Sequence, residues 1–439
     1  MSTHWTLPHG GLALDGFEQQ MLLPGTKGLP LQVPLRQGAV GVQGWNVLRA
    51  DTSFPVAVLK ADALRHNLDW MRDFCTRHGV LLAPHGKTTM SPQLFGAQLA
   101  NGAWGMTLAS AAQVQVAHRV GVRRVLLANQ LVAPADIAAM TALLQGDPEF
   151  VLVVLADSPE GVARLSAAAA VLPRPLPLLV ELGMPGKRAG CRTPEQALAL
   201  ARAIAAAPGV ALAGFEGYEG LISSADPEAD AQAVRAFVQQ LAALVGQADA
   251  EGLFCLPEIM LTAGGSAYFD LVARGFSGLP ALSRPVQPIL RSGCYLTSDH
   301  GSYRRLIAQA DAREASGPGL QAALEVWSVV LSRPEPDLAI LSMGKRDASY
   351  DMDLPLPLVH HRPGAGQPLP MPPGAAIVKM NDQHAYLRLP PEGPLCASLA
   401  VGDLVGCGIS HPCTTFDKWP LLLLVDSNYH VLSCVNTCF

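Results

Sequence analysis

A lysine that could do carbonyl chemistry follows the apolar run Val80–Ala83, in the segment PHGKTT at residues 84–89. If the run is a buried strand, Lys87 stands at the strand's C-terminal end. Desolvation there would lower the pKa of the amine, which suits it to form an imine with a carbonyl group. A solvated loop lysine is the alternative that this spacing leaves open.

Two loops rich in small residues are candidates for binding an anion. The first, TAGGS at 262–266, contains Gly264, Gly265 and Ser266, and the second, RSGCY at 291–295, contains Gly293 and Tyr295. Glycines let backbone N–H groups approach an anion closely, and a serine adds a hydroxyl donor. Together the two loops predict a site for a phosphate-bearing ligand.

An amine in one loop and a phosphate site in two others point to pyridoxal 5′-phosphate. Its aldehyde needs an amine partner, its phosphate needs an anchor, and its ring withdraws electrons from a reacting carbon. The sequence therefore predicts a pyridoxal phosphate site built around Lys87.

A third chemical feature is the segment HPC, which places His411 two residues before Cys413. On an extended segment these side chains can reach one ion, and imidazole with thiolate suits zinc. Two ligands fill only half of the four positions around zinc. The alternative to metal binding is a buried cysteine beside a surface histidine. His384, after Gln383, and the pair His360-His361 are further candidates, although the position of that pair among prolines favours a solvated loop.

The elements that must position these residues alternate along the middle of the chain. Ala-rich helical segments, expected at 109–120, 158–170, 194–207 and 227–250, lie between short branched strands, and Ser158, Thr193 and Asp226 are candidate N-caps. The expected strands are 80–84, 104–108, 125–129, 150–156, 176–183, 212–217, 257–263 and 288–291. Eight strands separated by helices predict a (β/α)8 TIM-type barrel, with a doubly wound open sheet as the alternative. Active sites of such barrels lie at the C-terminal ends of the strands.

After Arg305 the pattern changes to short strands and proline-rich turns, with no long helical period. Strands are expected at 322–331, 338–342, 374–379, 385–389, 403–407 and 421–426, which predicts an all-β domain. Ala57–Lys60 reads as a strand without a barrel helix and is expected to join that domain. We therefore predict a barrel over 61–305 and a β domain formed by 1–60 and 306–439.

The composition and charge of the chain argue against a membrane protein and against a nucleic-acid-binding protein. The chain has 439 residues, 49% of them hydrophobic and 15% charged, yet no apolar run is long enough to span a bilayer, so we expect no membrane role. A net charge of −5 without a basic patch argues against nucleic acid. The first residues lack a secretory signal, and nine scattered cysteines are an odd number, so a reducing cytoplasm is expected.

In combination, these motifs resemble the D-serine dehydratase and D-threonine aldolase family of alanine racemase-like (fold type III) pyridoxal phosphate enzymes. The resemblance runs from about Thr52 to the C-terminus, with the motifs in the family's order. It implies that Lys87 is the Schiff-base lysine, that Arg188 in VELGMPGKRAG contacts the cofactor ring, and that Tyr218 in FEGYEG lies near the ring. It also implies phosphate contacts from Gly264, Gly265, Ser266, Gly293 and Tyr295, and a metal held by His411 and Cys413. NDQHAYL at 381–387 resembles a segment near the family's active site.

Two positions depart from the family's pattern: Thr89 stands where a histidine often follows Lys-Thr, and Ser292 replaces a common proline. The His-Cys pair resembles the zinc-dependent dehydratases more than the manganese-type aldolases. The resemblance thus implies a homodimer that needs pyridoxal phosphate and zinc or another divalent metal, and that converts D-serine to pyruvate and ammonia. The alternatives are a low-specificity D-threonine aldolase, giving glycine and an aldehyde, and, further off, a racemase or a non-catalytic pyridoxal phosphate carrier.

Overall fold

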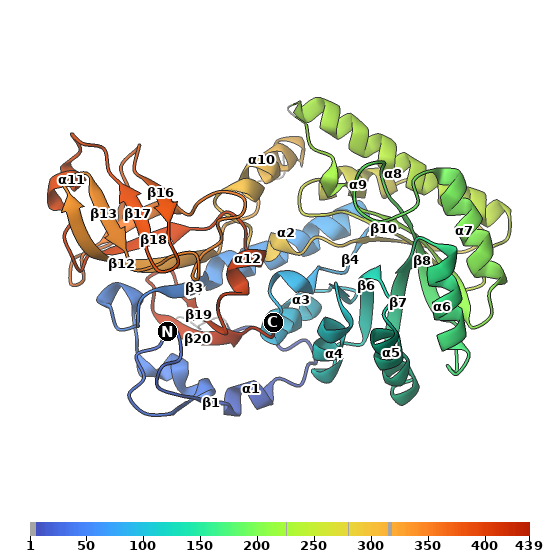
Figure 1. Ribbon diagram of the computed structural model, residues 1–439, viewed down its shortest axis with the longest axis horizontal. Helices are drawn as coiled ribbons and strands as arrows, with labels where there is room; N and C mark the ends of the chain where they lie inside the picture. The colour runs from blue at the N-terminus through green and yellow to red at the C-terminus, as the bar shows by residue number, and fades with distance from the viewer. Residues whose placement is uncertain (1–5, 225, 280, 315–317) are drawn as a thin grey trace. The chain divides into compact units, whose positions relative to one another are not determined.

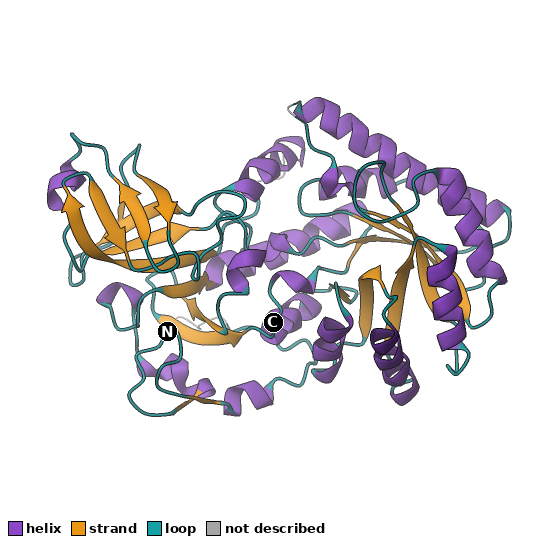
Figure 2. Ribbon diagram, viewed as in Figure 1, coloured by secondary structure: helices purple, strands orange, loops and turns teal. Residues whose placement is uncertain are grey.

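A computed structural model describes residues 6–224, 226–279, 281–314 and 318–439 (Figures 1 and 2). The chain divides into two compact units. One contains Met71–Lys87 and Gln98–Gly293; the other contains the residues up to Trp70, Thr88–Ala97 and Cys294–Phe439. The predicted domain boundaries, after residues 60 and 305, stay a prediction.

The first unit, which we call the barrel unit, is built on eight parallel strands in the order β4-β11-β10-β9-β8-β7-β6-β5. The sheet closes on itself, because Leu82 O accepts from Trp104 N at 2.7 Å and Pro84 O accepts from Thr107 N at 2.9 Å. The strands are β4 (Leu81–Leu82), β5 (Met106–Leu108), β6 (Arg124–Gln130), β7 (Val151–Ala156), β8 (Leu176–Leu182), β9 (Val210–Gly217), β10 (Ile259–Ala263) and β11 (Val286–Leu290). This is the predicted (β/α)8 barrel, and each expected strand overlaps one of its strands.

Helices follow the strands of the barrel unit, coloured from blue-green to yellow in Figure 1. They are α4 (Ala111–Arg119), α5 (Pro134–Gly146), α6 (Pro159–Ala169), α7 (Pro194–Ala206), α8 (Pro227–Ala250) and α9 (Phe269–Phe276), while α2 (Ala61–His78) and α3 (Pro92–Ala100) continue into the other unit. The side chains of Ser158, Thr193 and Asp226 accept hydrogen bonds from backbone N–H groups in the first turns of α6, α7 and α8. All three predicted caps are confirmed. Every residue of β9 is buried, as expected of a strand covered on both faces.

The second unit, the β unit, contains an antiparallel sheet in the order β15-β14-β18-β12-β13-β17-β16. The early strand β3 (Val56–Lys60) pairs antiparallel with β12 and parallel with β19, which confirms that the N-terminal segment joins the β domain. The strands after the barrel are β12 (Leu324–Glu335), β13 (Leu338–Leu341), β14 (Leu356–His361), β15 (Leu369–Pro370), β16 (Ala376–Met380), β17 (Ala385–Arg388), β18 (Leu404–Gly408), β19 (Leu421–Val425) and β20 (Val431–Asn436).

Shorter elements complete the β unit. They are α1 (Asp15–Gln19), β1 (Met21–Leu22), β2 (Leu35–Arg36), η1 (Gln37–Gln43), η2 (Val47–Arg49), η5 (Cys294–Leu296), α10 (Ser302–Glu314), α11 (Pro394–Ser398) and α12 (Cys413–Phe416). None of the described helices is both long and apolar enough to cross a bilayer. None of the nine cysteines, all of which lie in the described part of the chain, forms a disulfide.

Two sequence-based expectations for the β unit were wrong. A helix of 13 residues, α10, begins at Ser302 and continues past Arg305, where no long helix was expected. Only Ile307 and Ala310 are buried in it, so its sequence lacks a strong apolar stripe. His360 and His361 lie in β14 rather than in a solvated loop, and His361 is buried. The prolines around them misled the prediction, because β14 has a pairing irregularity between Pro357 and Val359 that accommodates one.

Candidate active site in the barrel unit and metal pair in the β unit

Lys87 lies in the one-turn helix η3 (Gly86–Thr88), which begins four residues after the end of β4 at Leu82. This is the C-terminal end of a barrel strand, where the sequence placed it. Its side chain is exposed, so burial within this chain does not supply the desolvation that the sequence predicted. The amine nevertheless lies at the edge of the barrel where such folds bind their ligands.

His85 shows that this strand end is electropositive. Burial of the imidazole and the positive charges of Lys87 and Arg291 lower the pKa of His85 well below its ordinary value, and Arg188 adds to the effect. The ring is therefore neutral at physiological pH. Its Nδ1 is buried and has no hydrogen-bond partner among the described residues. A neutral ring beside three cations suits a site that receives an anionic ligand.

Arg188 and Tyr218, both of which the family resemblance assigned to the cofactor ring, lie against each other. Arg188 lies in the loop after β8 and Tyr218 directly after β9, with the guanidinium carbon 4.8 Å from the centre of the phenol ring. A guanidinium over the face of a phenol ring is attracted to it by a cation–π interaction. Space beside the ring depends on Gly220, since a Cβ atom there would lie 2.4 Å from the Tyr218 hydroxyl.

The loop after β10 binds a carboxyl group through its backbone. Gly264 N and Gly265 N donate to the two oxygens of the Glu219 carboxyl group at 3.1 and 2.7 Å. Gly264 adopts φ +90°, which favours glycine, and a Cβ atom on Gly265 would lie 2.7 Å from the Tyr218 ring. Ser266 continues the same loop. Two adjacent N–H groups that point at one carboxyl group form the kind of cradle predicted for phosphate.

The loops after β10 and β11 are joined by Ser292, whose hydroxyl lies 3.1 Å from Gly264 O and 3.0 Å from Gly265 O. The departure from the family's proline thus supplies a hydrogen-bonding bridge. Gly293 lies against His85, because a Cβ atom on it would be 2.5 Å from His85 O. Tyr295 is buried in η5 and belongs to the β unit, so the structure assigns it no geometry toward these loops.

Sequence reasoning missed a group of buried charges inside the barrel unit. Arg291 forms an ion pair with Glu216 and donates to Gly217 O at 2.8 Å. Glu181 accepts a hydrogen bond from Gln130, and burial, reinforced by the charge of Glu216, raises the pKa of Glu181 to about 7. Burial also raises the pKa of Glu219. The sequence could have revealed this group, because its charged residues lie at the ends of β8, β9 and β11. Charged residues at the ends of buried barrel strands commonly have a functional role.

The barrel unit therefore offers an amine, an aromatic ring covered by a guanidinium, and a backbone cradle that already holds a carboxyl group. A ligand with an aldehyde, a flat ring and a phosphate matches this donor set. The residues present fit pyridoxal phosphate, with Lys87 for the aldehyde and the Gly264–Gly265 loop for an anionic oxygen.

The predicted metal pair lies in the β unit. His411 Nδ1 is 2.6 Å from Asp351 Oδ2, and Thr414 Oγ1 donates to Asp351 Oδ1 at 2.7 Å. A carboxylate behind one ring nitrogen is the support that metal-binding histidines commonly have, and it leaves Nε2 for an ion. Cys413 begins α12, and its thiol donates to Thr88 Oγ1 at 3.3 Å. Among the described residues, no three His, Cys, Asp or Glu side chains converge as a preformed metal site. The donor chemistry of the pair suits zinc, although the pair alone is incomplete.

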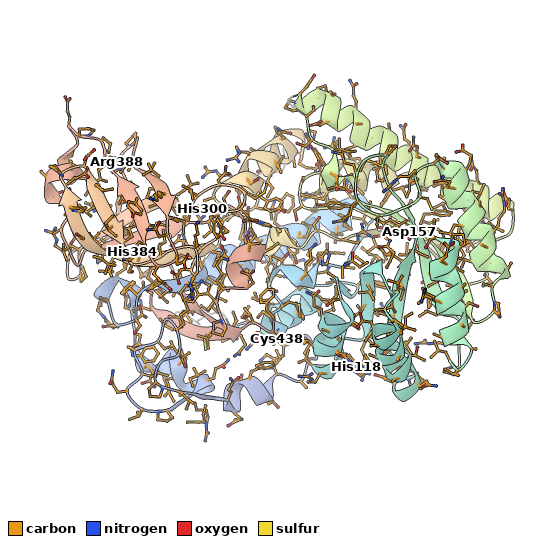
Figure 3. The ribbon with its side chains drawn as sticks, viewed as in Figure 1. His118, Asp157, His300, His384, Arg388 and Cys438 are labelled. Atoms are coloured by element: carbon orange, nitrogen blue, oxygen red, sulfur yellow. The ribbon has the colours of Figure 1, made fainter. Side chains whose placement is uncertain are left out.

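The other histidine candidate, His384, lies in the turn between β16 and β17 (Figure 3), where its carbonyl accepts from Asn381 N at 2.8 Å. Its side chain is exposed. His384 is therefore a hairpin residue, and among the described residues it makes no hydrogen bond with His411 or Cys413.

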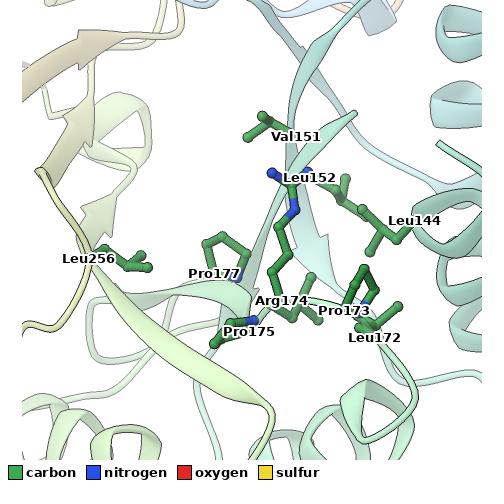
Figure 4. A pocket seen from close by; sticks show the side chains of 10 residues that line it. Leu144, Val151, Leu152, Leu172, Pro173, Arg174, Pro175, Pro177 and Leu256 are labelled. Atoms are coloured by element: carbon green, nitrogen blue, oxygen red, sulfur yellow. The ribbon is translucent and has the colours of Figure 1, made fainter. Parts of the chain in front are cut away.

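The barrel unit also has an apolar cavity of about 160 Å³ at the N-terminal ends of β7 and β8 (Figure 4). Leu144, Val151, Leu152 and a run of prolines line it, and the Arg174 guanidinium donates to Phe150 O beside it. It lies at the end of the strands opposite to Lys87 and the glycine loops. That end of such barrels serves stability, so we assign it no chemistry.

A closed (β/α)8 barrel with an amine and an anion cradle at its C-terminal edge, joined to an antiparallel β unit, defines an alanine racemase-like protein. Residues 59–269 match the family model “Alanine racemase, N-terminal domain”, and residues 323–425 match “Putative serine dehydratase domain”. The chain thus combines an alanine racemase N-terminal domain with a serine dehydratase domain, and the family resemblance that its motifs predicted is confirmed.

Curated relatives agree with this assignment. A 3-hydroxy-D-aspartate aldolase of Paracoccus denitrificans (strain Pd 1222) is 28% identical over 69% of this chain and 74% of the relative. A D-threonine aldolase of Arthrobacter sp is 26% identical over 78% of this chain and 81% of the relative.

Solved structures support the fold. The crystal structure of D-threonine aldolase from Filomicrobium marinum has a TM-score of 0.74 at 24% identity and covers 88% of this chain and 96% of its own. A cysteine-to-alanine variant of a D-threo-3-hydroxyaspartate dehydratase, described as metal-free, has a TM-score of 0.68 at 20% identity over 88% of this chain and 97% of its own.

Proposed function

We propose that the chain is a pyridoxal phosphate- and divalent metal-dependent lyase of D-3-hydroxy amino acids, and that it converts D-serine to pyruvate and ammonia. The observation that carries the proposal is the barrel edge itself. Lys87 lies in the loop after β4, and in the same unit the Gly264 and Gly265 N–H groups bind a carboxyl group. The family and the names of the relatives support the substrate class.

Each residue has a chemical task in this reaction. Lys87 would hold the cofactor through its aldehyde and then remove the Cα proton of the substrate. Arg188 and Tyr218 would orient the ring, while the loops around Gly264, Gly265, Ser266, Gly293 and Tyr295 would anchor the phosphate. The bound cofactor supplies an electron sink for the charge that develops at Cα.

His411 and Cys413 would hold zinc or another divalent metal, and Asp351 would keep the His411 ring in orientation. Such a metal acts as a Lewis acid on the 3-hydroxyl, which is otherwise a poor leaving group. One of the similar solved structures is a dehydratase, and this supports dehydration as the reaction.

Aldol cleavage is the second candidate, because the curated relatives named above are aldolases. In that reaction a base removes the hydroxyl proton and the Cα–Cβ bond breaks, so D-threonine gives glycine and an aldehyde. From the family resemblance we also propose a homodimer, which the molar mass in solution tests, and a cytoplasmic location.

The experiment combines a spectrum with product identification. The purified protein with pyridoxal phosphate should show the visible absorbance of an imine, and Lys87→Ala should lose it. Pyruvate formed from D-serine, and abolished by a chelator, would support metal-dependent dehydration. Glycine from D-threonine without pyruvate from D-serine would favour the aldolase, and a bound cofactor without turnover of either substrate would contradict both.

A further inference from the structure

A second cysteine lies against the proposed metal ligand Cys413. The Sγ atoms of Cys294 and Cys413 are 3.7 Å apart, although 119 positions separate the residues in the sequence. Thr88 Oγ1 lies within hydrogen-bonding distance of both thiols, at 3.8 Å from Cys294 Sγ and 3.3 Å from Cys413 Sγ. All three residues belong to the β unit.

The spacing of the two sulfur atoms matches that of two thiolates on one tetrahedral ion. With Zn–S bonds of about 2.3 Å and tetrahedral angles, the two sulfurs lie roughly 3.8 Å apart. A disulfide would instead require about 2.05 Å. The thiol pair is therefore spaced for sharing an ion without any movement of the backbone.

His411 is suited to supply a nitrogen to the same ion. It stands two residues before Cys413, and its Nδ1 is engaged by Asp351 at 2.6 Å, so Nε2 is the nitrogen that faces a metal. Its ring does not yet converge with the two thiols, since the described residues contain no preformed group of three ligands. Completing the site needs reorientation of one imidazole that is partly exposed.

We propose that Cys294 is a ligand of the divalent metal, so that the ion is held by His411, Cys413 and Cys294. Two cysteines and one histidine leave the fourth tetrahedral position open, which is the composition of a catalytic rather than a structural zinc site. The substrate's 3-hydroxyl would take that position. The inference rests on the proposed metal-dependent function and adds a ligand that the family resemblance does not supply.

A second thiolate changes which metal ions the site binds preferentially. Two sulfur ligands select soft or borderline ions such as Zn²⁺ over the hard ions Mg²⁺ and Mn²⁺. Thr88 lies where it can donate a hydrogen bond to either thiolate, and such support tunes the ligands it contacts. The site is thus a zinc site by composition, and manganese should bind weakly.

The test replaces the metal with Co²⁺ in the full-length protein, because thiolate-to-cobalt charge transfer gives a near-ultraviolet band whose intensity follows the number of thiolates. We expect Cys294→Ser and Cys413→Ser each to lose about half of the intensity per bound cobalt and the double variant to lose nearly all of it. Competition with a chelator should show at least ~10-fold weaker binding for each single variant. Cys255→Ser, which removes an exposed thiol of the barrel unit, is the matched control and should change neither quantity.

A measurement on the unaltered protein guards against misfolding of the variants. Removing zinc with a chelator should raise alkylation of the partly exposed Cys413 and, to a smaller extent, of the buried Cys294, read by peptide mass, while labelling of Cys255 stays constant. If Cys413→Ser weakens cobalt binding but Cys294→Ser leaves the band and the affinity unchanged, Cys294 is no ligand and the proposed function stands. If the unaltered protein binds no cobalt or zinc, the metal requirement of the proposed function fails together with this inference.

Discussion

Glu181 is the acid whose titration should be most visible in the stability of the barrel unit. It lies near the end of β8, is 6% exposed, and accepts a hydrogen bond from Gln130. Burial, followed by the charge of Glu216, raises its pKa from 4.5 to about 7. The folded state therefore binds a proton that the unfolded state has already released between these two pH values, so this group lowers stability as pH rises through that window.

Glu181→Gln mimics the protonated acid and should therefore abolish the loss of folding stability that the ionisation of Glu181 causes as the pH rises. The variant and the unaltered protein should have similar stability near pH 4.5, and the variant should be more stable above pH 7, by at most about 3 kcal/mol. Urea unfolding of the cofactor-free protein from pH 4.5 to 8.5 measures this difference. Glu195→Gln, at an exposed carboxyl group whose pKa is lowered by Thr193, is the control and should show no gain at high pH. A constant difference at all pH values would contradict the assignment.

Single residues also show where sequence reasoning reaches its limit. The positions of Lys87 and the two glycine loops were predictable, because strand ends and loop composition are local properties of the sequence. The bonds from Gly264 and Gly265 to Glu219 span about 45 positions, and the thiol contact between Cys294 and Cys413 spans 119. No periodicity encodes such pairs, so only the folded chain brings them together.

At the scale of elements, three barrel helices have the N-terminal side-chain caps that the sequence predicted. Thr193 Oγ1 accepts from Gln196 N at 3.2 Å, and Pro194 occupies the first turn of α7, where a missing N–H costs nothing. Ser158 and Asp226 cap α6 and α8 in the same way. Local chemistry of this kind is why these helices were predicted correctly, whereas α10, with few buried residues, was missed.

Thr193→Ala should cost about 1 kcal/mol of stability, because it leaves a backbone N–H of the first turn without its acceptor. Thr141→Ala is a matched control: its hydroxyl bonds only Ile137 O within α5, and alanine favours a helix interior. We expect its stability to be unchanged or slightly higher. Thermal unfolding of both variants by circular dichroism compares them, and equal losses would argue that the cap contributes nothing specific.

At the scale of the whole chain, the β unit is assembled from both ends of the sequence. β3 lies between β12 and β19. The hydrophobic core of the β unit contains Val56 and Val58 from the start of the chain, beside Leu421 and Leu423 from the end of the chain. The sequence indicated this arrangement, because Ala57–Lys60 was a strand without a barrel helix. The pairing partners were not predictable, since β12 and β19 both lie more than 250 positions further along the chain.

Val58→Ala should loosen this sheet on both sides of β3. The side chain is fully buried, so removing two methyl groups should cost roughly 2 kcal/mol and leave a small cavity. Val33→Ala is a matched control in the same N-terminal segment, since Val33 is 70% exposed. Hydrogen exchange should quicken in β12 and β19 of the first variant and in neither strand of the second, while the strands of the barrel sheet keep their protection in both. Faster exchange confined to β3 would show that β12 and β19 do not depend on the strand between them, and that the N-terminal segment covers the sheet without holding it together.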